Sequence, residues 1–193
     1  MKNSNKDPQL VHRKVAILGF RAVGKTSLTN AFVSGTFAET YDPTIESLHH
    51  KTIRFRKVHF ATDIVDTAGM DEYSRLSRNA SLGVHGYALV FSIVSRQSFE
   101  RIVDLNETLL NTLGDAPDVP RVLVGSMKDL SDDQRQVTTV EAQALADSWK
   151  VPYIECSSKT GENVAEVFHI LLKEIEKDEG LLVESGDGGC HIL

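Results

Sequence analysis

The 193-residue chain has only two cysteines, Cys156 and Cys190, which lie far apart and show no zinc-binding spacing. So few cysteines predict neither a disulfide framework nor a structural metal site, and they fit a reducing compartment. No apolar run approaches the ~20 residues that a membrane-spanning helix needs. The polar residues 1–8 hold no apolar signal core. We therefore expect neither a secreted protein nor an integral membrane protein.

Lysine and arginine are dispersed along the chain and form no basic cluster. There are 21 of them against 27 acidic residues, which gives a formal net charge of −6. A negative balance provides no general attraction to nucleic acid or to anionic lipid, so we expect no nucleic acid partner. The composition, 41% hydrophobic and 25% charged, is ordinary for a single globular domain.

A glycine-containing turn at residues 19–26 follows the apolar run 15–18 and precedes a helix-forming run. This order, with two glycines before Lys25 and Thr26, is typical of a phosphate-binding loop. The backbone N–H groups of such a loop face an oligophosphate, and the helix N-terminus adds a favourable dipole. We predict that Lys25 contacts the β- and γ-phosphates and that the Thr26 hydroxyl binds Mg²⁺. The residues of this turn expected to bind nucleotide are Gly19, Arg21, Ala22, Val23, Gly24, Lys25, Thr26 and Ser27.

Strand-like apolar runs alternate with helical patterns from residue 13 to about residue 177. The expected strands are 14–18, 48–56, 58–65, 86–94, 121–125 and 152–156. Because 48–56 and 58–65 follow each other too closely for a crossover helix, we expect an antiparallel hairpin at one edge of the sheet. The chain is therefore predicted to have an α/β fold of the P-loop NTPase class. Its sheet is mixed, six-stranded and mostly parallel, with helices on both faces.

Two helix starts have capping-box spacing, Thr138 with Glu141 and Asn163 with Glu166. In the last helix, apolar residues recur at helical spacing and predict a stripe packed against the sheet. This stripe consists of Val164, Val167, Phe168, Leu171 and Ile175. Residues 34–47 show no period, and so long an unpatterned connection is usually functional.

Asp66 and Gly69 form an Asp-x-x-Gly pattern where the third apolar run ends. Ligands of an open parallel sheet bind beyond the carboxyl ends of its strands, and the glycine-containing turn leaves its strand at the same end. We expect Asp66 to hold Mg²⁺, often through water, and the Gly69 N–H to contact a γ-phosphate. The pattern is weak by itself, because Asp and Gly are common in turns.

Two further segments, 41–46 and 155–159, complete a set of motifs that resembles the Ras family of small GTPases over residues 14–177. Within this family, some segments are most similar to the Rheb subfamily. The positions that resemble this subfamily are Arg21, residues 71–74, Tyr87 and residues 146–149.

The resemblance implies a guanine nucleotide switch that uses GTP or GDP and Mg²⁺. It assigns residues 37–48 to the first switch and 69–78 to the second, and it makes Thr44 a ligand of Mg²⁺ and the γ-phosphate. Because GDP lacks that phosphate, the nucleotide state would bias the order of both switches. The remaining nucleotide contacts implied by the resemblance are Phe37 on the guanine, Tyr41 over the phosphates, and Ser157, Ser158 and Lys159 after the last strand.

The family's guanine-reading box, Asn-Lys-x-Asp, is Ser126, Met127, Lys128 and Asp129 here. Asp129 can still accept hydrogen bonds from the guanine N1–H and amino group, so guanine preference should persist. The absent Asn removes an amide that contacts the base and ties loops together. Ser126 and Lys128 replace the usual side chains only in part, and Lys128, offset by one residue, should face solvent. Each lost hydrogen bond is worth about 0.5–1.5 kcal/mol, so we expect weak nucleotide retention.

Met70 stands where the family places the glutamine that orients the attacking water. A thioether has no donor and only a weak acceptor, so intrinsic GTP hydrolysis should be very slow and no catalytic residue is assigned. Arg21 either offers charge to the phosphates or is solvated.

The chain ends in Cys190, His191, Ile192 and Leu193, a prenylation box whose final leucine favours geranylgeranyl over farnesyl. A single lipid without an adjacent basic cluster gives reversible attachment. We expect residence on the cytoplasmic face of endomembranes or the plasma membrane, with a cytosolic fraction. The predicted organisation is a flexible N-terminus (1–12), a GTPase domain (13–177) and a hypervariable tail (178–193).

The primary hypothesis is a monomeric switch that binds effector proteins, including a kinase by analogy with Rheb. An exchange factor and a GTPase-activating protein would act on it. Two alternatives stay open. One is a nucleotide-binding pseudo-GTPase scaffold, which Met70, Ser126 and Met127 favour, and the other is a small P-loop phosphotransferase.

Overall fold

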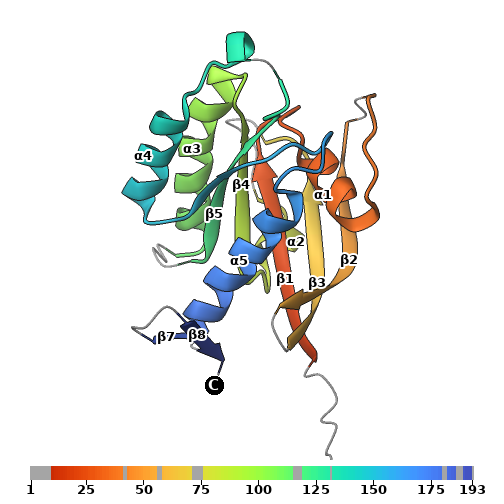
Figure 1. Cartoon of the computed structure of the whole chain (residues 1–193), viewed down its shortest axis with the longest axis vertical. Helices are drawn as coiled ribbons and strands as arrows, with labels where there is room; N and C mark the ends of the chain where they lie inside the picture. The colour runs from red at the N-terminus through yellow and green to blue at the C-terminus, as the bar shows by residue number, and fades with distance from the viewer. Residues whose placement is uncertain are drawn as a thin grey trace, which may run out of the picture.

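Figure 1 shows the computed structural model of the chain. It describes residues 10–40, 43–55, 58–70, 76–114, 119–130, 132–179, 182–185 and 189–192, the last two ranges for their backbone. The elements in chain order are β1 (Leu10–Gly19), α1 (Lys25–Ser34), β2 (Glu46–Phe55), β3 (Val58–Thr67), α2 (Arg78–Ser81), β4 (Gly86–Ser92), α3 (Arg96–Thr112), β5 (Arg121–Ser126), the 3-10 helix Asp132–Gln134, α4 (Thr139–Trp149), β6 (Tyr153–Glu155), α5 (Val164–Asp178), β7 (Leu182–Ser185) and β8 (Gly189–Ile192).

The main sheet has six strands in the order β2-β3-β1-β4-β5-β6. The β2–β3 pair is antiparallel, and the other four pairs are parallel. The predicted mixed sheet, with its hairpin at one edge, is confirmed. The chain adds a separate antiparallel pair, β7–β8, after α5.

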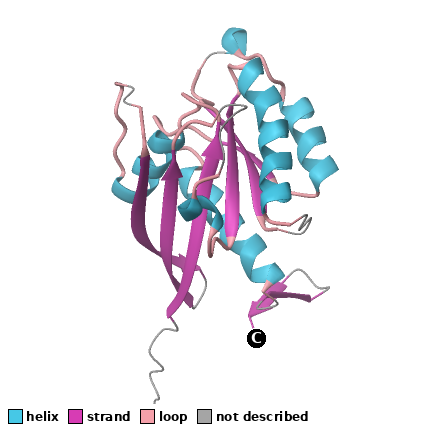
Figure 2. Cartoon of the chain, turned by 180° about the vertical axis from the view of Figure 1, so that it is seen from behind, coloured by secondary structure: helices cyan, strands magenta, loops and turns pink. Residues whose placement is uncertain are grey.

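Two hydrophobic layers enclose the sheet. On one side, Leu28 and Phe32 of α1 and the buried face of α5 pack on the sheet residues Val15 and Ile17. On the other side, α2, α3 and α4 pack on the alternate sheet residues, which include Ala16. Figures 1 and 2 show the helices on both faces, as predicted. Successive residues of β1 are therefore buried in opposite layers, as the alternation of side chains along a strand requires.

The last helix confirms the predicted apolar stripe. Its five stripe residues are all buried, and the ring of Phe168 stacks on that of Phe32 with centroids 3.8 Å apart. This contact joins α5 to α1, the helix that follows the glycine-containing turn.

Of the two predicted capping boxes, one is confirmed and one is wrong. The Thr138 hydroxyl accepts from the Glu141 N–H, and the Glu141 carboxylate accepts from the Thr138 N–H. Asn163 instead adopts a left-handed conformation with φ of 58° and makes no side-chain cap. Its Nδ2 donates to the Glu155 carbonyl 2.8 Å away, so its amide tethers the loop to β6.

Residues 10–12, expected to belong to the flexible N-terminus, form the start of β1 and pair with β3. Within the described residues, no helix is long and apolar enough to cross a bilayer.

Candidate functional site

A cavity of about 520 Å³ lies at the carboxyl ends of β1, β3 and β5. Twelve of the predicted nucleotide-binding residues line it: Ala22, Gly24, Lys25, Thr26, Ser27, Phe37, Thr44, Gly69, Ser126, Asp129, Ser158 and Lys159. Segments that are far apart in the sequence therefore meet at the edge of the sheet where the strand-end argument places them.

The glycine-containing turn wraps around the buried amine of Lys25, which is 6% exposed. Its Nζ donates to the carbonyls of Gly19 at 3.1 Å and Phe20 at 2.9 Å. Burial lowers the Lys25 pKa to about 8, and the nearby Asp66 carboxylate opposes this shift. A bound phosphate group, like the Asp66 carboxylate, would raise the Lys25 pKa and so favour the charged amine. The turn ends at Gly24, whose φ of 87° is accessible to glycine at little cost.

Gly69 brings the end of β3 close to the turn. A Cβ atom at this position would lie 2.5 Å from the Arg21 Cα. The next residue, Met70, donates its backbone N–H to the Gly19 carbonyl at 3.1 Å. Only glycine at residue 69 allows this approach.

Three oxygen-bearing side chains meet beside Lys25. The Thr26 and Thr44 hydroxyls are 2.7 Å apart. Asp66 is fully buried, and neither of its carboxylate oxygens accepts a hydrogen bond from the described residues. Burial raises the Asp66 pKa, while the nearby Thr26, Lys25 and His49 side chains oppose that shift.

A buried carboxylate that accepts no hydrogen bond from the described part of the chain, beside two hydroxyls, fits a hard cation such as Mg²⁺. The described residues contain no cluster of three or more His, Cys, Asp or Glu side chains that could hold a metal alone. A cation here therefore needs phosphate or water oxygens as further ligands.

Ser126 is buried at the end of β5 beneath the other end of the cavity. Its hydroxyl lies 2.7 Å from the Val23 carbonyl and 2.9 Å from the Phe91 carbonyl, so it can donate to either. The expected loss of the loop tie is thus wrong in part, because Ser126 still joins β5 to the glycine-containing turn.

Asp129 is exposed at the cavity, and its Oδ1 accepts from the Ser157 hydroxyl at 2.6 Å. Ser157 is buried and also accepts from the Thr160 N–H. The hydrogen bond from Ser157 therefore fixes the position of the Asp129 carboxylate, which the sequence predicts to accept hydrogen bonds from guanine.

Met127 and Lys128 point in different directions. Met127 lines the cavity in a left-handed conformation, φ 65°, and the Ser92 hydroxyl lies 3.1 Å from its Sδ. Lys128 does not line the cavity, and its Nζ pairs with the Glu162 carboxylate. This pairing agrees with the expectation that Lys128 does not lie over the base, and a contact between Lys128 and the nucleotide stays a prediction.

Met70 and Arg21 both lie outside the cavity lining. Met70 is 8% exposed and belongs to the hydrophobic cluster that includes Ala16, Leu18 and Val65. Arg21 is exposed, with its guanidinium 5.3 Å from the centroid of the Phe20 ring. Of the two alternatives for Arg21, this geometry favours the solvated side chain.

The other predicted site residues either lie behind the cavity lining or fall outside the described residues. Gly19, Val23 and Ser157 support the lining through the contacts described above. Tyr41 and the Cys190 side chain lie outside the described residues.

Seven residues that line the cavity were not named from the sequence as nucleotide contacts, although Met127 belongs to the predicted guanine-reading box and residues 38–40 to the predicted first switch. They are Asn30, Ala38, Glu39, Thr40, Thr67, Met127 and Leu130. Their positions next to predicted site residues are the signal that could have identified them. Asn30 is one helical turn after Thr26, and the others directly follow or lie among predicted site residues.

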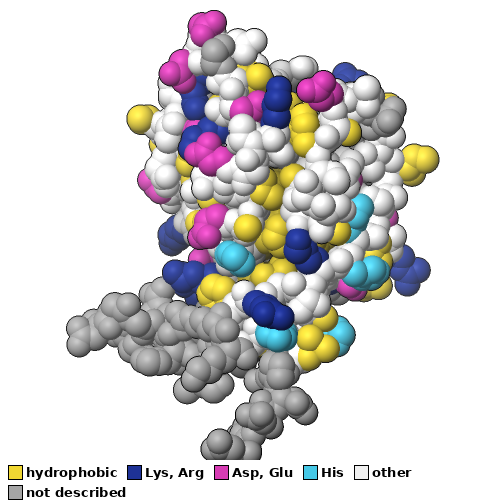
Figure 3. Space-filling model, turned by 45° about the vertical axis from the view of Figure 1, so that its right-hand side comes forward, with side chains coloured by type: hydrophobic (Ala, Val, Ile, Leu, Met, Phe, Trp, Pro, Cys, Tyr) yellow, Lys and Arg dark blue, Asp and Glu magenta, His cyan; other side chains and the backbone are white. Residues whose placement is uncertain are grey.

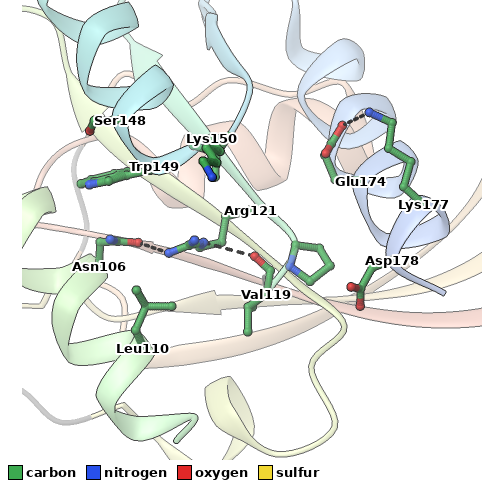
Figure 4. A pocket seen from close by; sticks show the side chains of 12 residues that line it. Asn106, Leu110, Val119, Arg121, Ser148, Trp149, Lys150, Glu174, Lys177 and Asp178 are labelled. Carbon is green, nitrogen blue, oxygen red and sulfur yellow. Dashed lines mark hydrogen bonds and ion pairs between the residues drawn. The ribbon is translucent and has the colours of Figure 1, made fainter. Parts of the chain in front are cut away.

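A second cavity, of about 590 Å³, lies where α3, α4 and α5 meet the start of β5 (Figure 4). Arg121 at its centre is already engaged, because it donates to Asn106 Oδ1 at 2.6 Å and to the Val119 carbonyl at 3.1 Å. This cavity contains no phosphate-binding turn and none of the predicted site residues.

The fold and the glycine-containing turn together define an α/β protein of the P-loop class. The chain belongs to the Ras family, which it matches over residues 14–177. It is 45% identical to the GTP-binding protein rhb1 of Schizosaccharomyces pombe over 180 residues, 93% of this chain and 96% of that protein. It is 40% identical to the human GTP-binding protein Rheb over 186 residues, 96% of this chain and all of that protein. The predicted Ras-like and Rheb-like character is confirmed.

Proposed function

We propose that this protein is a guanine nucleotide switch that binds GTP and GDP with Mg²⁺. The observation that carries the proposal is one cavity lined by Lys25, Thr26 and Thr44 at one end and by Asp129 at the other. The buried Asp66 carboxylate lies behind the first end, near Thr26 and Lys25. Lys25 and the N–H groups of the turn hold the phosphates, and Asp129 accepts from the guanine N1–H and amino group. Adenine would present an acceptor to Asp129, which disfavours it.

Thr26, Thr44 and Asp66 are the residues that would hold Mg²⁺, directly or through water. When bound, the ion neutralises phosphate charge. Of the three, only Thr44 belongs to the long connection between α1 and β2. Its contact therefore couples the γ-phosphate to the shape of residues 37–48, the proposed first switch.

The proposed second switch, residues 69–78, is linked to the first by Glu46. One carboxylate oxygen of Glu46 accepts from Asn79 Nδ2 at 2.7 Å, and the other accepts from the Ser77 hydroxyl. Ser77 also caps α2 by accepting from the Ala80 N–H. A change at Thr44, two residues before Glu46, can thus reach the second switch.

Intrinsic hydrolysis is proposed to be very slow, because Met70 cannot orient water and its side chain packs in the core. The same observation favours the second candidate function, a nucleotide-binding scaffold without meaningful turnover. The two candidates differ in whether product forms at all.

The partners are proposed by analogy with the Ras family, to which the chain belongs, and with Rheb. We propose effectors that bind the two switches, one of them a kinase in Rheb-like growth signalling, together with an exchange factor and a GTPase-activating protein. The protein would act as a monomer on the cytoplasmic face of a membrane, anchored reversibly by a prenyl chain on Cys190.

The test is to identify the nucleotide retained by the purified chain and to follow bound GTP through a single turnover. The switch predicts bound GDP or GTP, no competition by ATP, and slow conversion to GDP. Stable GTP without product identifies the scaffold. Absence of guanine nucleotide binding contradicts both.

A further inference from the structure

The lower halves of β1, β2 and β3 present a sheet face that no helix within the described residues covers (Figure 2). The strand registers place nine residues of this face in three rows: Leu10, His59 and Arg54; His12, Ala61 and Thr52; Lys14, Asp63 and His50. All nine are exposed or half-buried. On the opposite face, Ile53 and Phe60 are buried in the core. We call these nine residues the open sheet face.

The open sheet face carries more positive than negative groups, although the whole chain has a formal charge of −6. Lys14 and Arg54 supply two cations, and the nine residues include three histidines. The single carboxylate among them, Asp63, pairs with His50 at 2.6 Å between Oδ1 and Nδ1. Figure 3, which shows the neighbouring side of the molecule rather than the open sheet face, also has histidine and basic side chains in its lower half.

Exposed leucines border these cations. Leu10 is 56% exposed and pairs across the sheet with His59. Leu48, 52% exposed, precedes His50 by two residues and so continues the same face. Leu82 is 62% exposed, and its carbonyl accepts from Lys14 Nζ at 3.1 Å. Apolar side chains beside basic ones are the composition of surfaces that bind the headgroup region of a membrane.

The C-terminal tail cannot provide this electrostatic contact. Residues 178–193 contain no lysine or arginine and hold four acids, Asp178, Glu179, Glu184 and Asp187. One lipid chain gives only marginal, reversible binding, and stable attachment takes a second signal. The start of β1 and the strand β8 lie at the same end of the molecule (Figure 1). A membrane that holds the tail is thus within reach of the open sheet face.

We propose that the open sheet face binds the anionic phospholipid surface of the membrane and supplies the second attachment signal. The inference rests on the proposed prenyl anchor at Cys190. It adds that the folded domain, and not the tail, recognises lipid charge. Each basic side chain near an anionic surface is worth about fivefold in binding, and the attraction decreases as salt increases.

The experiment measures partition of the full chain into phosphatidylcholine vesicles with and without phosphatidylserine, for prenylated and unprenylated protein. Arg54→Glu is compared with Arg101→Glu on α3. Both substitutions change the net charge equally, but only the first alters the open sheet face. Arg54→Gln is a milder second variant, and retained guanine nucleotide binding shows that each variant is folded.

For both protein forms, we expect phosphatidylserine to increase wild-type binding at low salt. Arg54→Glu should reduce that gain by about fivefold or more, Arg54→Gln by less, and Arg101→Glu should retain it. Equal losses in the two glutamate variants, or no phosphatidylserine gain in the wild type, would overturn the proposal. Mass spectrometry of the cellular protein tests the anchor separately, because the unprenylated chain reports on the open sheet face alone.

Discussion

The Thr26 hydroxyl lies 2.7 Å from the Thr44 hydroxyl, although 18 residues separate the two in the chain. Thr26 belongs to α1, whereas Thr44 belongs to the connection that leads to β2. The buried carboxylate of Asp66, from β3, lies near Thr26. A rigid helix, a rigid strand and a connecting loop therefore meet at one point. A ligand that binds there can order the loop without moving the sheet.

Asp66→Asn should lower the affinity for Mg²⁺ by about tenfold or more, because the amide keeps the size of the side chain and removes its charge. The measurement is the release rate of a fluorescent GDP as Mg²⁺ is titrated. Asp63→Asn on the same strand, whose side chain is 46% exposed, is the control. Equal Mg²⁺ dependence in the two variants would refute the assignment of Asp66.

Met70→Gln should increase single-turnover GTP hydrolysis, since it restores a side chain able to orient water. It should also lower the free energy of unfolding by about 1–3 kcal/mol, because Met70 packs in the core. Met70→Leu keeps the packing and should leave turnover unchanged. An unchanged rate in Met70→Gln, or a wild-type rate typical of Ras proteins, would disprove the role given to Met70.

Ser126→Ala should speed nucleotide release and lower stability by about 1–3 kcal/mol. The reason is that the Val23 and Phe91 carbonyls lose the single hydroxyl that can donate to either of them. Stopped-flow release of GDP and urea unfolding measure the two effects. Ser81→Ala is the control, because Ser81 is half-buried in α2, does not line the cavity, and donates its hydroxyl to the Ser77 carbonyl at 3.0 Å. Release no faster than in that control would contradict a supporting role of Ser126 in the site.

Glu155 predicts a pH dependence of stability. The Arg135 guanidinium, 2.8 Å away, lowers the Glu155 pKa from its ordinary 4.5 to about 2. The ion pair therefore stabilises the fold above pH 4.5, and its contribution is lost as the pH falls from 4.5 toward 2. Glu155→Gln should lower the free energy of unfolding by about 2–3 kcal/mol at pH 7.

The same comparison at pH 3 should show a much smaller difference, because part of the wild-type advantage has been titrated away. Urea unfolding at both values is the measurement, with the exposed Glu100→Gln as control. A loss that is equally large at both pH values would exclude the ion pair as its cause.

The strands, the hairpin at one edge and the place of the site at the carboxyl ends of the strands were predictable, because apolar runs and short motifs specify them locally. The strand order was not predicted. Side-chain directions at the motif positions were not predictable. Asn163 has capping-box spacing, yet its left-handed backbone turns the amide toward Glu155. Ser126 stands where the family has Asn, so the sequence predicts that a contact between loops is lost. In the structure, the Ser126 hydroxyl instead lies within hydrogen-bond distance of the carbonyl of the distant residue Val23. Such contacts depend on how separate segments pack, which one-dimensional spacing does not encode.

Amide hydrogen exchange at Thr44 and Gly69, compared between the GDP complex and the complex with a non-hydrolysable GTP analogue and Mg²⁺, tests the switch most directly. The account predicts slower exchange at both residues with the analogue, because only a γ-phosphate offers them a partner. Val90, buried in the central strand β4, should be unaffected. Identical exchange at Thr44 and Gly69 in the two complexes would contradict it.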